Sequence, residues 1–301
     1  MTSISSALFT LIRFSYNEFK PFKQRISRYS PSERLQRIHF LNQEVLVMAF
    51  LTCELKSDCL RMNTTVSLIL PQDIHRDAKT PPVLYLLHGC PHNHSVWQRY
   101  TALERYAEER DLAIIMPEAN RSFYTDMKYG VDYFSYISRE LPDLCERMFG
   151  ISSDPAHRYI SGLSMGGYGC LKISLSNPSA YRACFALSAL SDIRLHIHRT
   201  KETDPKIRDY RAVFGPELTP PDDQDVYYLA KQALLSPSRP ALYFYCGLQD
   251  GMYPEVQDLD DYLQKLHYLV TSKYWDGIHD WKFWDEAIQL VLHNIDDLEN
   301  A

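Results

Sequence analysis

The sequence predicts an α/β fold, a mostly parallel eight-stranded sheet flanked by helices. Three observations lead to this prediction. Two apolar runs, 49–55 and 65–70, are separated by a polar turn, as in an opening antiparallel hairpin. Six further apolar runs alternate with segments that suit helices, which is the pattern of parallel strands joined by crossover helices. One long segment with little strand character, 189–238, interrupts the alternation and predicts a small cap insertion.

The six later strands are expected where apolar residues follow one another directly, because strands buried on both faces need no polar alternation. They are expected at 83–87, 112–116, 158–162, 183–187, 241–246 and 268–275. Helices are expected at 97–109, 133–149, 170–175, 255–267 and 280–295. The insertion is expected to lie over the carboxyl ends of the strands, where ligands bind in such sheets.

Residues 1–47 differ from the rest of the chain, with seven Lys or Arg against three Glu and no glycine. Two interpretations stay open. The segment is either a basic extension, disordered or acting as a tether or partner-binding arm, or a translated upstream region that is not native, with Met48 the natural start. In both cases the main domain is expected to span 48–301.

The composition is that of an ordinary globular protein, with 45% hydrophobic and 23% charged residues and a formal net charge of −6. This mild acidity argues against nucleic acid as the main partner. No apolar run approaches the roughly 18 residues of a membrane span. The seven cysteines are scattered within apolar runs, as expected of reduced thiols. We therefore expect a cytoplasmic protein without nucleic-acid or membrane partners; its oligomeric state, a homo-oligomer included, stays open.

The stretch 159–169 contains a Gly-x-Ser-x-Gly motif built from Gly162, Ser164 and Gly166. An apolar run precedes it and a helix-compatible run follows, which is the context of a nucleophile elbow. The serine there adopts a strained backbone conformation, and the flanking glycines remove Cβ atoms that would clash. The following helix directs its N-terminal N–H groups toward a reacting oxygen. Ser164 is therefore the candidate nucleophile, although the motif alone also fits a loop serine.

A base and an acid follow at the positions that a serine nucleophile requires. The hydroxyl must lose its proton to a base, and the base needs a partner that orients it. Asp250 directly follows the strand 241–246, and His279 directly follows the strand that ends at Trp275. This is the order of nucleophile, acid and base along a hydrolase sheet. The sequence therefore predicts a catalytic triad of Ser164, Asp250 and His279.

Other interpretations of these residue types are weaker. Asp250 precedes a glycine, which is also common in plain turns. The rival acids, Asp276 and Asp280, lie too close in sequence to His279 to orient it easily. The rival bases, His267 and His293, fall in predicted helices. Two alternate-residue histidine pairs, 92/94 and 196/198, lack a clearly placed third metal ligand. We therefore expect neither a metal nor another cofactor.

The tetrahedral oxyanion needs two fixed N–H donors. One is expected to be the amide of Met165, the residue after the nucleophile. The other is expected from the loop after the strand 83–87, where the Cys90 amide is the first candidate and the Gly89 amide the second. Pro91 cannot donate.

Aromatic residues predict an apolar acyl pocket. Phe123 and Tyr124 lie on a loop at the expected face of the sheet, and Tyr253, Trp281 and Trp284 follow the acid or the base. Aromatic residues are also ordinary core components, and for the two tryptophans this alternative is at least as strong.

The motifs together resemble a known family, over about Met48 to the chain end. They are Leu87-His88-Gly89, Phe123-Tyr124-Thr125-Asp126, Tyr129-Gly130-Val131-Asp132-Tyr133, the elbow 162–169, Cys246-Gly247-x-x-Asp250 and His279-Asp280-Trp281. The chain is similar to the bacterial tributyrin esterases, in the esterase D and S-formylglutathione hydrolase branch of the α/β-hydrolases, to which feruloyl and acetylxylan esterases are related.

The resemblance implies a cofactor-free serine carboxylesterase that acts on small-molecule short-chain acyl esters, with deacetylation of sugars as a further activity. It assigns the same triad. Two departures matter: residues 1–47 have no counterpart, and the loop 90–94 differs from the pattern of formylglutathione enzymes. The alternatives that stay open are an S-formylglutathione hydrolase, an acyltransferase and a non-catalytic binding protein of hydrolase fold.

Overall fold

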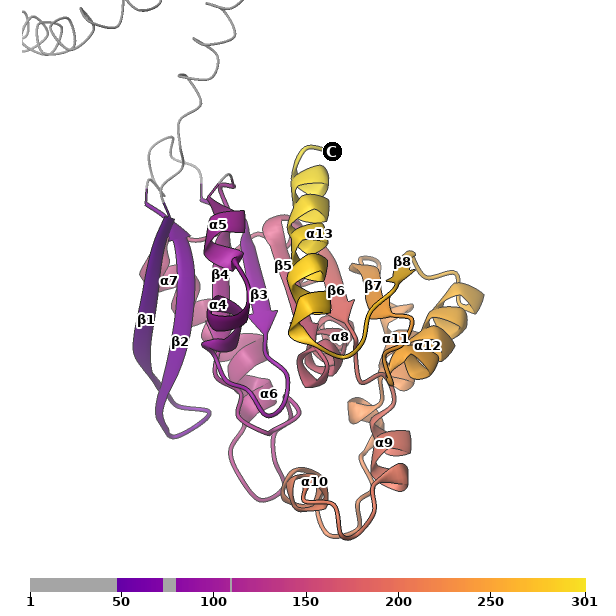
Figure 1. Ribbon diagram of the computed structural model, residues 1–301. Helices are drawn as coiled ribbons and strands as arrows, with labels where there is room; N and C mark the ends of the chain where they lie inside the picture. The colour runs from indigo at the N-terminus through magenta and orange to yellow at the C-terminus, as the bar shows by residue number, and fades with distance from the viewer. Residues whose placement is uncertain (1–47, 73–79, 109) are drawn as a thin grey trace, which may run out of the picture. The chain divides into compact units, whose positions relative to one another are not determined.

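The computed structural model describes residues 48–72, 80–108 and 110–301, all of which belong to one structural unit. The predicted basic extension, 1–47, lies outside the described residues. At the centre is an eight-stranded sheet with the order β1-β2-β4-β3-β5-β6-β7-β8 (Figure 1). The predicted eight-stranded, mostly parallel sheet is therefore confirmed.

The sheet opens with an antiparallel hairpin and continues with parallel strands. Strand β1 pairs antiparallel with β2, and β2 pairs antiparallel with β4; every later pair is parallel. The strands are β1 Met48–Ser57, β2 Met62–Pro71, β3 Val83–Leu87, β4 Ala113–Pro117, β5 Arg158–Leu163, β6 Ala183–Leu187, β7 Ala241–Gly247 and β8 Val270–Trp275. Strand β8 begins later than predicted, because the Tyr268 amide donates to the Leu263 carbonyl at 3.0 Å and closes the preceding helix.

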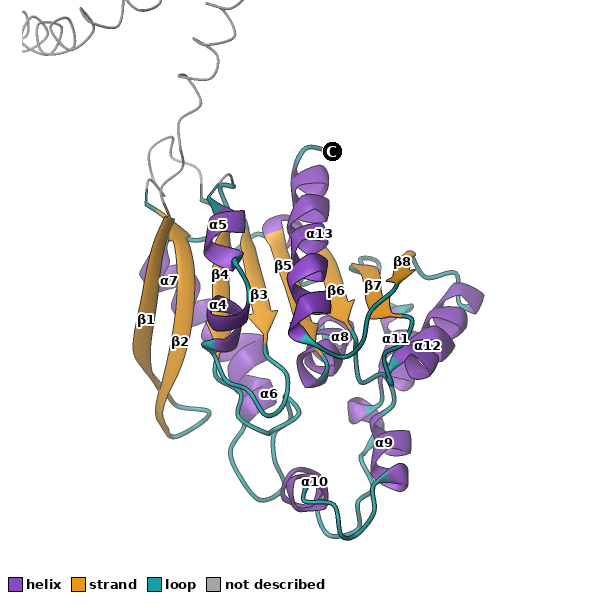
Figure 2. Cartoon of the chain, in the orientation of Figure 1, coloured by secondary structure: helices purple, strands orange, loops and turns teal. Residues whose placement is uncertain are grey.

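Helices cover both faces of the sheet (Figures 1 and 2). Successive residues of β3 point into different layers: Tyr85 packs in one apolar cluster and Leu84 in the other. One face carries α4 Val96–Tyr100, α5 Leu103–Ala107 and α13 Trp281–Glu299, and the other carries α6 Tyr133–Ser135, η1 Tyr136–Glu140, α7 Leu141–Phe149, α8 Met165–Ser176, α11 Val226–Ala233 and α12 Tyr253–Lys265. Among the described residues, no helix has the length and apolar character to cross a bilayer.

Two predicted helices differ from the structure in their interior. The helix expected at 97–109 is broken into α4 and α5 at Thr101, whose backbone is extended and whose hydroxyl donates to the Trp97 carbonyl at 2.6 Å. The helix expected at 133–149 is continuous but contains a π-helical turn, η1. Pro142 has no N–H for the carbonyl of Ser138, four residues earlier, so the α-helical pattern cannot be satisfied there.

The predicted insertion, 189–238, has two structurally different parts. Its first part contains α9 Ile193–Arg199 and α10 Lys206–Phe214, which Figure 1 shows beyond the carboxyl ends of the parallel strands. Its last part contains the short helix η3 Asp222–Gln224 and then α11, which packs against α8 on the face of the sheet. Only the first part therefore occupies the place of a cap.

One carboxylate ties the opening hairpin to the helical layer. Glu140, in η1, accepts hydrogen bonds from the Ser57 hydroxyl at 2.6 Å, the Asp58 amide at 2.7 Å and the Cys59 amide at 3.2 Å. Burial alone would raise the pKa of Glu140, but the hydrogen bonds from Ser57 and from the two amides hold it below its usual value. The ionised carboxylate thus stabilises the turn between β1 and β2.

We predict that Glu140→Gln lowers the free energy of unfolding by about 1–2 kcal/mol at neutral pH, because hydrogen bonds to a charged acceptor are lost. The pKa of Glu140 is lower in the folded protein than in the unfolded chain. The stabilisation is therefore complete above the unfolded pKa of about 4.3 and is lost as the pH falls through the folded value. Urea unfolding of both proteins between pH 7 and pH 3 measures this.

The matched control is Glu202→Gln, since the Glu202 carboxylate makes only an exposed ion pair with Arg211. A pH-independent difference between wild type and Glu140→Gln would contradict the assignment.

Candidate active site

Ser164 stands at a strained turn between β5 and α8. Its φ of 54° and ψ of −114° lie in a region that non-glycine residues rarely adopt. Two backbone hydrogen bonds hold it there: the Ser164 amide donates to the Leu187 carbonyl at 2.9 Å, and the Leu190 amide donates to the Ser164 carbonyl at 3.2 Å. The end of β6 and the loop after it thus fix both backbone polar groups of the serine.

The two glycines of the motif allow three segments to meet at the elbow. A Cβ on Gly162 would lie 2.3 Å from the Gly166 oxygen, and a Cβ on Gly166 would lie 2.6 Å from the Leu87 oxygen. Both distances are far below van der Waals contact, so any side chain would push the backbones apart. The glycines therefore let α8 begin directly against the end of β3.

The structure brings Ser164, His279 and Asp250 together from the loops that follow β5, β8 and β7. His279 Nε2 lies 3.0 Å from Ser164 Oγ, and His279 Nδ1 lies 3.0 and 2.9 Å from the two oxygens of Asp250. This arrangement makes Nδ1–H the donor to the carboxylate and leaves Nε2 to accept the serine proton.

Asp250 is buried and is held ionised by its neighbours. It is 4% exposed, and its Oδ1 accepts a hydrogen bond from the Met252 amide at 2.8 Å. Burial alone would raise the pKa of Asp250, but the hydrogen bonds from His279 and Met252 outweigh it and hold the pKa below its usual value. The carboxylate is thus negatively charged at neutral pH and keeps the imidazole in one tautomer.

The rival acids and the rival base His293 have other neighbours. Asp276 accepts a hydrogen bond from the side chain of Gln249 at 3.2 Å, and Asp280 caps α13 by accepting from the Phe283 amide at 3.0 Å. His293 is exposed on α13 beside Asp297. The rings of Trp284 and His279 pack in a T-shaped arrangement, with 4.9 Å between ring centroids, so Trp284 supports the imidazole.

The loop after β3 passes close to the serine. A Cβ on Gly89 would lie 3.3 Å from the Cβ of Ser164. Among the residues described, the amides of Met165 and Cys90 donate to no acceptor. These two amides therefore remain candidate oxyanion donors.

His88 fixes the start of this loop. Its buried Nε2 accepts the Ala119 amide at 3.0 Å, so the proton resides on Nδ1, which donates to the Gly89 carbonyl at 2.9 Å. The Tyr124 hydroxyl donates to the His88 carbonyl at 2.8 Å. The loop that carries the Gly89 and Cys90 amides is therefore held from both sides.

The predicted acyl-pocket residues Phe123 and Tyr124 lie in the core instead of on an open wall. Phe123 is 4% exposed and Tyr124 is fully buried, and both have positive φ values, 50° and 53°. Phe123 packs against Tyr210 of α10, with ring centroids 5.0 Å apart. Tyr124 supports the loop after β3, and Phe123 contacts α10 of the insertion.

Of the other three aromatic candidates, Trp284 is buried, and Tyr253 and Trp281 are half-buried. Tyr253, at the start of α12, packs edge-on against Tyr274, with 5.1 Å between centroids. Trp281 stacks on the half-exposed ring of Tyr100 at 5.0 Å and meets the edge of Trp284 at 5.2 Å. An aromatic layer thus extends from the base to the surface.

Lys172 is a buried lysine that the sequence interpretation missed. Its Nζ, on α8, donates to the Phe123 carbonyl at 3.1 Å, the Thr125 hydroxyl at 2.7 Å and the Gln224 side-chain oxygen at 2.7 Å. Burial holds the pKa of Lys172 well below its usual value. This side chain links the nucleophile helix to the loop that carries Tyr124 and to the end of the insertion. The sequence does contain a signal for this buried side chain, because Lys172 is a charged residue type within the apolar run 170–175.

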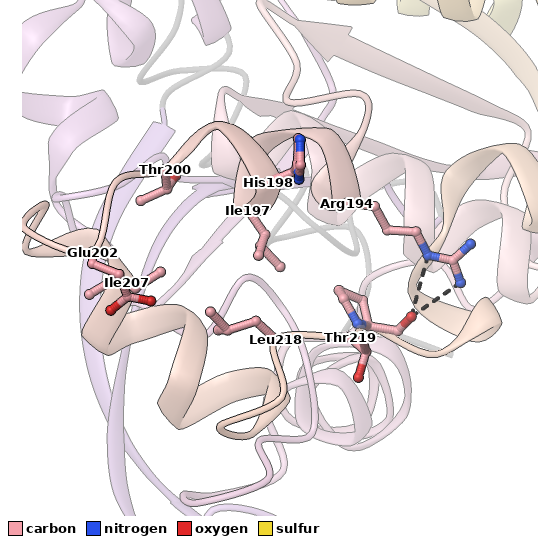
Figure 3. Close-up of a pocket in the computed structure, with 9 residues that line it drawn as sticks. Arg194, Ile197, His198, Thr200, Glu202, Ile207, Leu218 and Thr219 are labelled. Atoms are coloured by element: carbon pink, nitrogen blue, oxygen red, sulfur yellow. Dashed lines mark hydrogen bonds between the residues drawn. The ribbon is translucent and has the colours of Figure 1, made fainter.

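Two cavities adjoin helix α9. The α9–α10 pocket, of about 600 Å³, is lined by Ile197, Ile207 and Leu218, and Arg194 at its rim donates to the Pro220 carbonyl (Figure 3). None of Ser164, Asp250 and His279 lines this pocket. The α9–α12 pocket, of about 610 Å³, includes Gly251 and Met252, which directly follow Asp250. Of these two pockets, the second is the one whose lining includes the sequence neighbours of Asp250.

No group of three or more His, Cys, Asp or Glu side chains that could hold a metal ion is present in 48–72, 80–108 and 110–301. His94, one of the paired histidines, instead contacts the Ser67 hydroxyl through Nδ1 at 2.8 Å.

The chain is also similar to known proteins. A family model described as "Putative esterase" matches residues 57–293. An acetyl esterase of Caldicellulosiruptor saccharolyticus is 30% identical over 258 residues, which cover 80% of this chain and 96% of that protein.

Two solved structures from Staphylococcus aureus are also similar. One is an S-formylglutathione hydrolase that is 30% identical in sequence and superimposes with a TM-score of 0.75. The match covers 83% of this chain and 99% of the hydrolase chain. The other is the fluorophosphonate-binding serine hydrolase F, which is 30% identical and superimposes with a TM-score of 0.74. This match covers 82% of this chain and 98% of the hydrolase chain. Together with the sheet, these similarities confirm the predicted α/β-hydrolase fold.

We predict that Lys172→Met lowers the free energy of unfolding by about 2 kcal/mol, because three acceptors, two of them fully buried, lose their donor. We also expect kcat to fall about 10-fold with little change in KM, since the loop that positions the oxyanion donors loses its support. Thermal unfolding and steady-state kinetics measure the two effects. Lys231→Met, at an exposed position of α11, is the matched control. Wild-type stability in Lys172→Met would contradict the role given to the network.

Proposed function

The chain belongs to the esterase family and is a carboxylic ester hydrolase of small-molecule esters, and from that premise we propose that it cleaves short-chain acyl esters through Ser164, His279 and Asp250. The observation that carries the proposal is the 3.0 Å distance between His279 Nε2 and Ser164 Oγ, combined with a buried carboxylate on the other ring nitrogen. Such an arrangement makes a serine hydroxyl nucleophilic.

The first half of the proposed reaction forms an acyl-enzyme. Ser164 Oγ forms a bond to the ester carbonyl carbon as its proton passes to His279 Nε2, and the carbonyl π electrons move onto the oxygen. The Met165 and Cys90 amides stabilise this oxyanion, with the Gly89 amide as the alternative donor. When the C–O bond to the alcohol breaks, His279 gives its proton to the departing oxygen.

The second half releases the acid. Water loses a proton to His279 as it attacks the acyl carbon, and the intermediate collapses with return of the proton to Ser164. Asp250 stabilises the imidazolium in both halves. An alcohol in place of water would give acyl transfer by the same steps.

The preference for short acyl groups is supported by the relatives. Two of them are named for acetyl and formyl groups, which are the smallest acyl groups. Deacetylation of sugars fits the same chemistry. We also place the enzyme in the cytoplasm, since all seven of its cysteines are free thiols and four of them are buried.

A second candidate activity is hydrolysis of S-formylglutathione, which the 30% identity to such an enzyme favours. Relative rates on this thioester and on short oxygen esters discriminate the two. A non-catalytic binding role is disfavoured, because the proposed base lies within hydrogen-bond distance of both the nucleophile and the acid.

We predict that Ser164→Ala lowers kcat on p-nitrophenyl acetate by several orders of magnitude, about 10³ or more, because the attacking oxygen is removed. His279→Ala should lower kcat by a similar factor. His293→Ala, which changes an exposed histidine, is the matched control and should keep the wild-type kcat. Initial rates on acetate, butyrate and octanoate esters, with circular dichroism to verify folding, provide the measurement. Turnover of a folded Ser164→Ala variant at the wild-type rate would disprove the mechanism, and a preference for octanoate would disprove the short-chain assignment.

A further inference from the structure

Ser188 is a buried serine with an unusual backbone and takes no part in the proposed chemical steps. It follows β6 directly, is 0% exposed and has a φ of 43°. A positive φ is uncommon for a residue with a Cβ atom, and glycine would adopt it without strain. Strained residues persist where the surrounding structure requires them. The presence of serine here therefore indicates that its hydroxyl group has a use.

The Ser188 hydroxyl accepts a hydrogen bond from Trp284 on α13. Trp284 Nε1 lies 3.1 Å from Ser188 Oγ, and both side chains are buried. The backbone of Ser188 is fixed in turn, because its amide donates to the Tyr245 carbonyl of β7 at 2.8 Å. The indole N–H thus has an acceptor that is held firmly by the sheet.

Trp284 contacts the proposed base directly. Its ring and the imidazole of His279 are T-shaped, with an angle of 87° and 4.9 Å between centroids. Trp281 also packs against Trp284, at 85° and 5.2 Å. These ring contacts restrict the position of the indole, whereas the hydrogen bond to Ser188 sets the direction in which Nε1 points.

The two hydrogen bonds of the imidazole leave one rotation weakly restrained. Nδ1 is bound to Asp250 and Nε2 to Ser164, at the two sides of the ring. Rotation about the line between these partners changes the two distances little, but it tilts the ring away from the departing oxygen that must receive the proton. The His279 side chain is 32% exposed, so the packing of Trp284 on its covered part opposes this rotation.

We propose that Ser188 is a positioning residue for the base: its hydroxyl group fixes the indole of Trp284, and the indole fixes the plane of the His279 imidazole. This inference rests on the proposed function and adds a support for the base beyond Asp250. Leu187, one residue earlier, accepts a hydrogen bond from the Ser164 amide at 2.9 Å. Two consecutive residues at the end of β6 therefore hold the nucleophile and the support of the base.

The first test replaces Ser188 in the full-length chain. Ser188→Ala removes the hydroxyl group and keeps the strained Cβ atom, whereas Ser188→Gly removes both. We expect kcat on p-nitrophenyl acetate to fall about 10-fold in each variant with little change in KM, because misalignment of the base affects the transition state alone. Ser188→Gly should melt about 2–4 °C above Ser188→Ala, since glycine relieves the strain. Equal losses of kcat at unequal stability separate positioning from folding.

The second test asks whether Ser188 acts through Trp284. Trp284→Phe keeps an aromatic ring and removes the N–H donor, and we expect it to lower kcat about 10-fold as well. The double variant Ser188→Ala/Trp284→Phe should also lose about 10-fold, instead of the roughly 100-fold expected of independent sites, because both changes break one hydrogen bond. Ser191→Ala is the matched control and should keep the wild-type kcat, since Ser191 is equally buried and donates to the Ala189 carbonyl of its own loop.

A fluorophosphonate distinguishes a misaligned base from a partly unfolded protein. Ser164 Oγ forms a bond to phosphorus as fluoride leaves, and the serine proton passes to His279. The number of labels per chain thus counts intact active sites, and the rate constant reports the base. By intact mass spectrometry we expect one label per chain in wild type and in Ser188→Ala, with a rate constant about 10-fold lower in the variant.

Wild-type kcat in the Ser188 variants would overturn the inference, as would losses that multiply in the double variant. Fewer than one label per chain at an unchanged rate constant would also overturn it, because Ser188 would then serve the fold alone. Failure of the proposed function is distinguishable, because Ser164→Ala would then retain wild-type turnover.

Discussion

The strained backbone of Ser164 is the constraint on which the rest of the structure depends. Leu187 and Leu190 fix the amide and carbonyl of the serine, so a φ of 54° is held by the end of β6. The glycines then bring α8 against β3, which places the oxyanion loop beside the hydroxyl. The acid and base arrive from the neighbouring strands β7 and β8. Each group that the chemistry needs therefore reaches the site through the sheet.

Features that depend on local pattern could be predicted from the sequence. Continuous apolar runs located β3 and β6 at the expected residues, because strands buried on both faces leave this signature. The places of Asp250 and His279 followed from strand order alone, since parallel strands deliver their following loops to one edge. The hydrogen bonds to His279 have the geometry that this reasoning required.

Features that depend on tertiary contacts could not be predicted. Nothing local distinguishes an aromatic pocket wall from a buried support, and Tyr124 proved to be the latter because its hydroxyl finds the His88 carbonyl. Likewise, the π-helical turn before Pro142 interrupts a pattern that reads as regular helix.

The segment between β6 and α11 is fastened at both ends to the nucleophile helix. Leu190 binds the Ser164 carbonyl at one end, and at the other Gln224 accepts hydrogen bonds from Lys172 through its side chain and from Tyr168 through its carbonyl. Everything between these anchors, α9 and α10 included, is attached to a frame that already contains the nucleophile. A change in the middle of the segment would therefore reach Ser164 through these two anchors and through the contacts of α10 with the loop 121–129, so the length of the segment is constrained at three places.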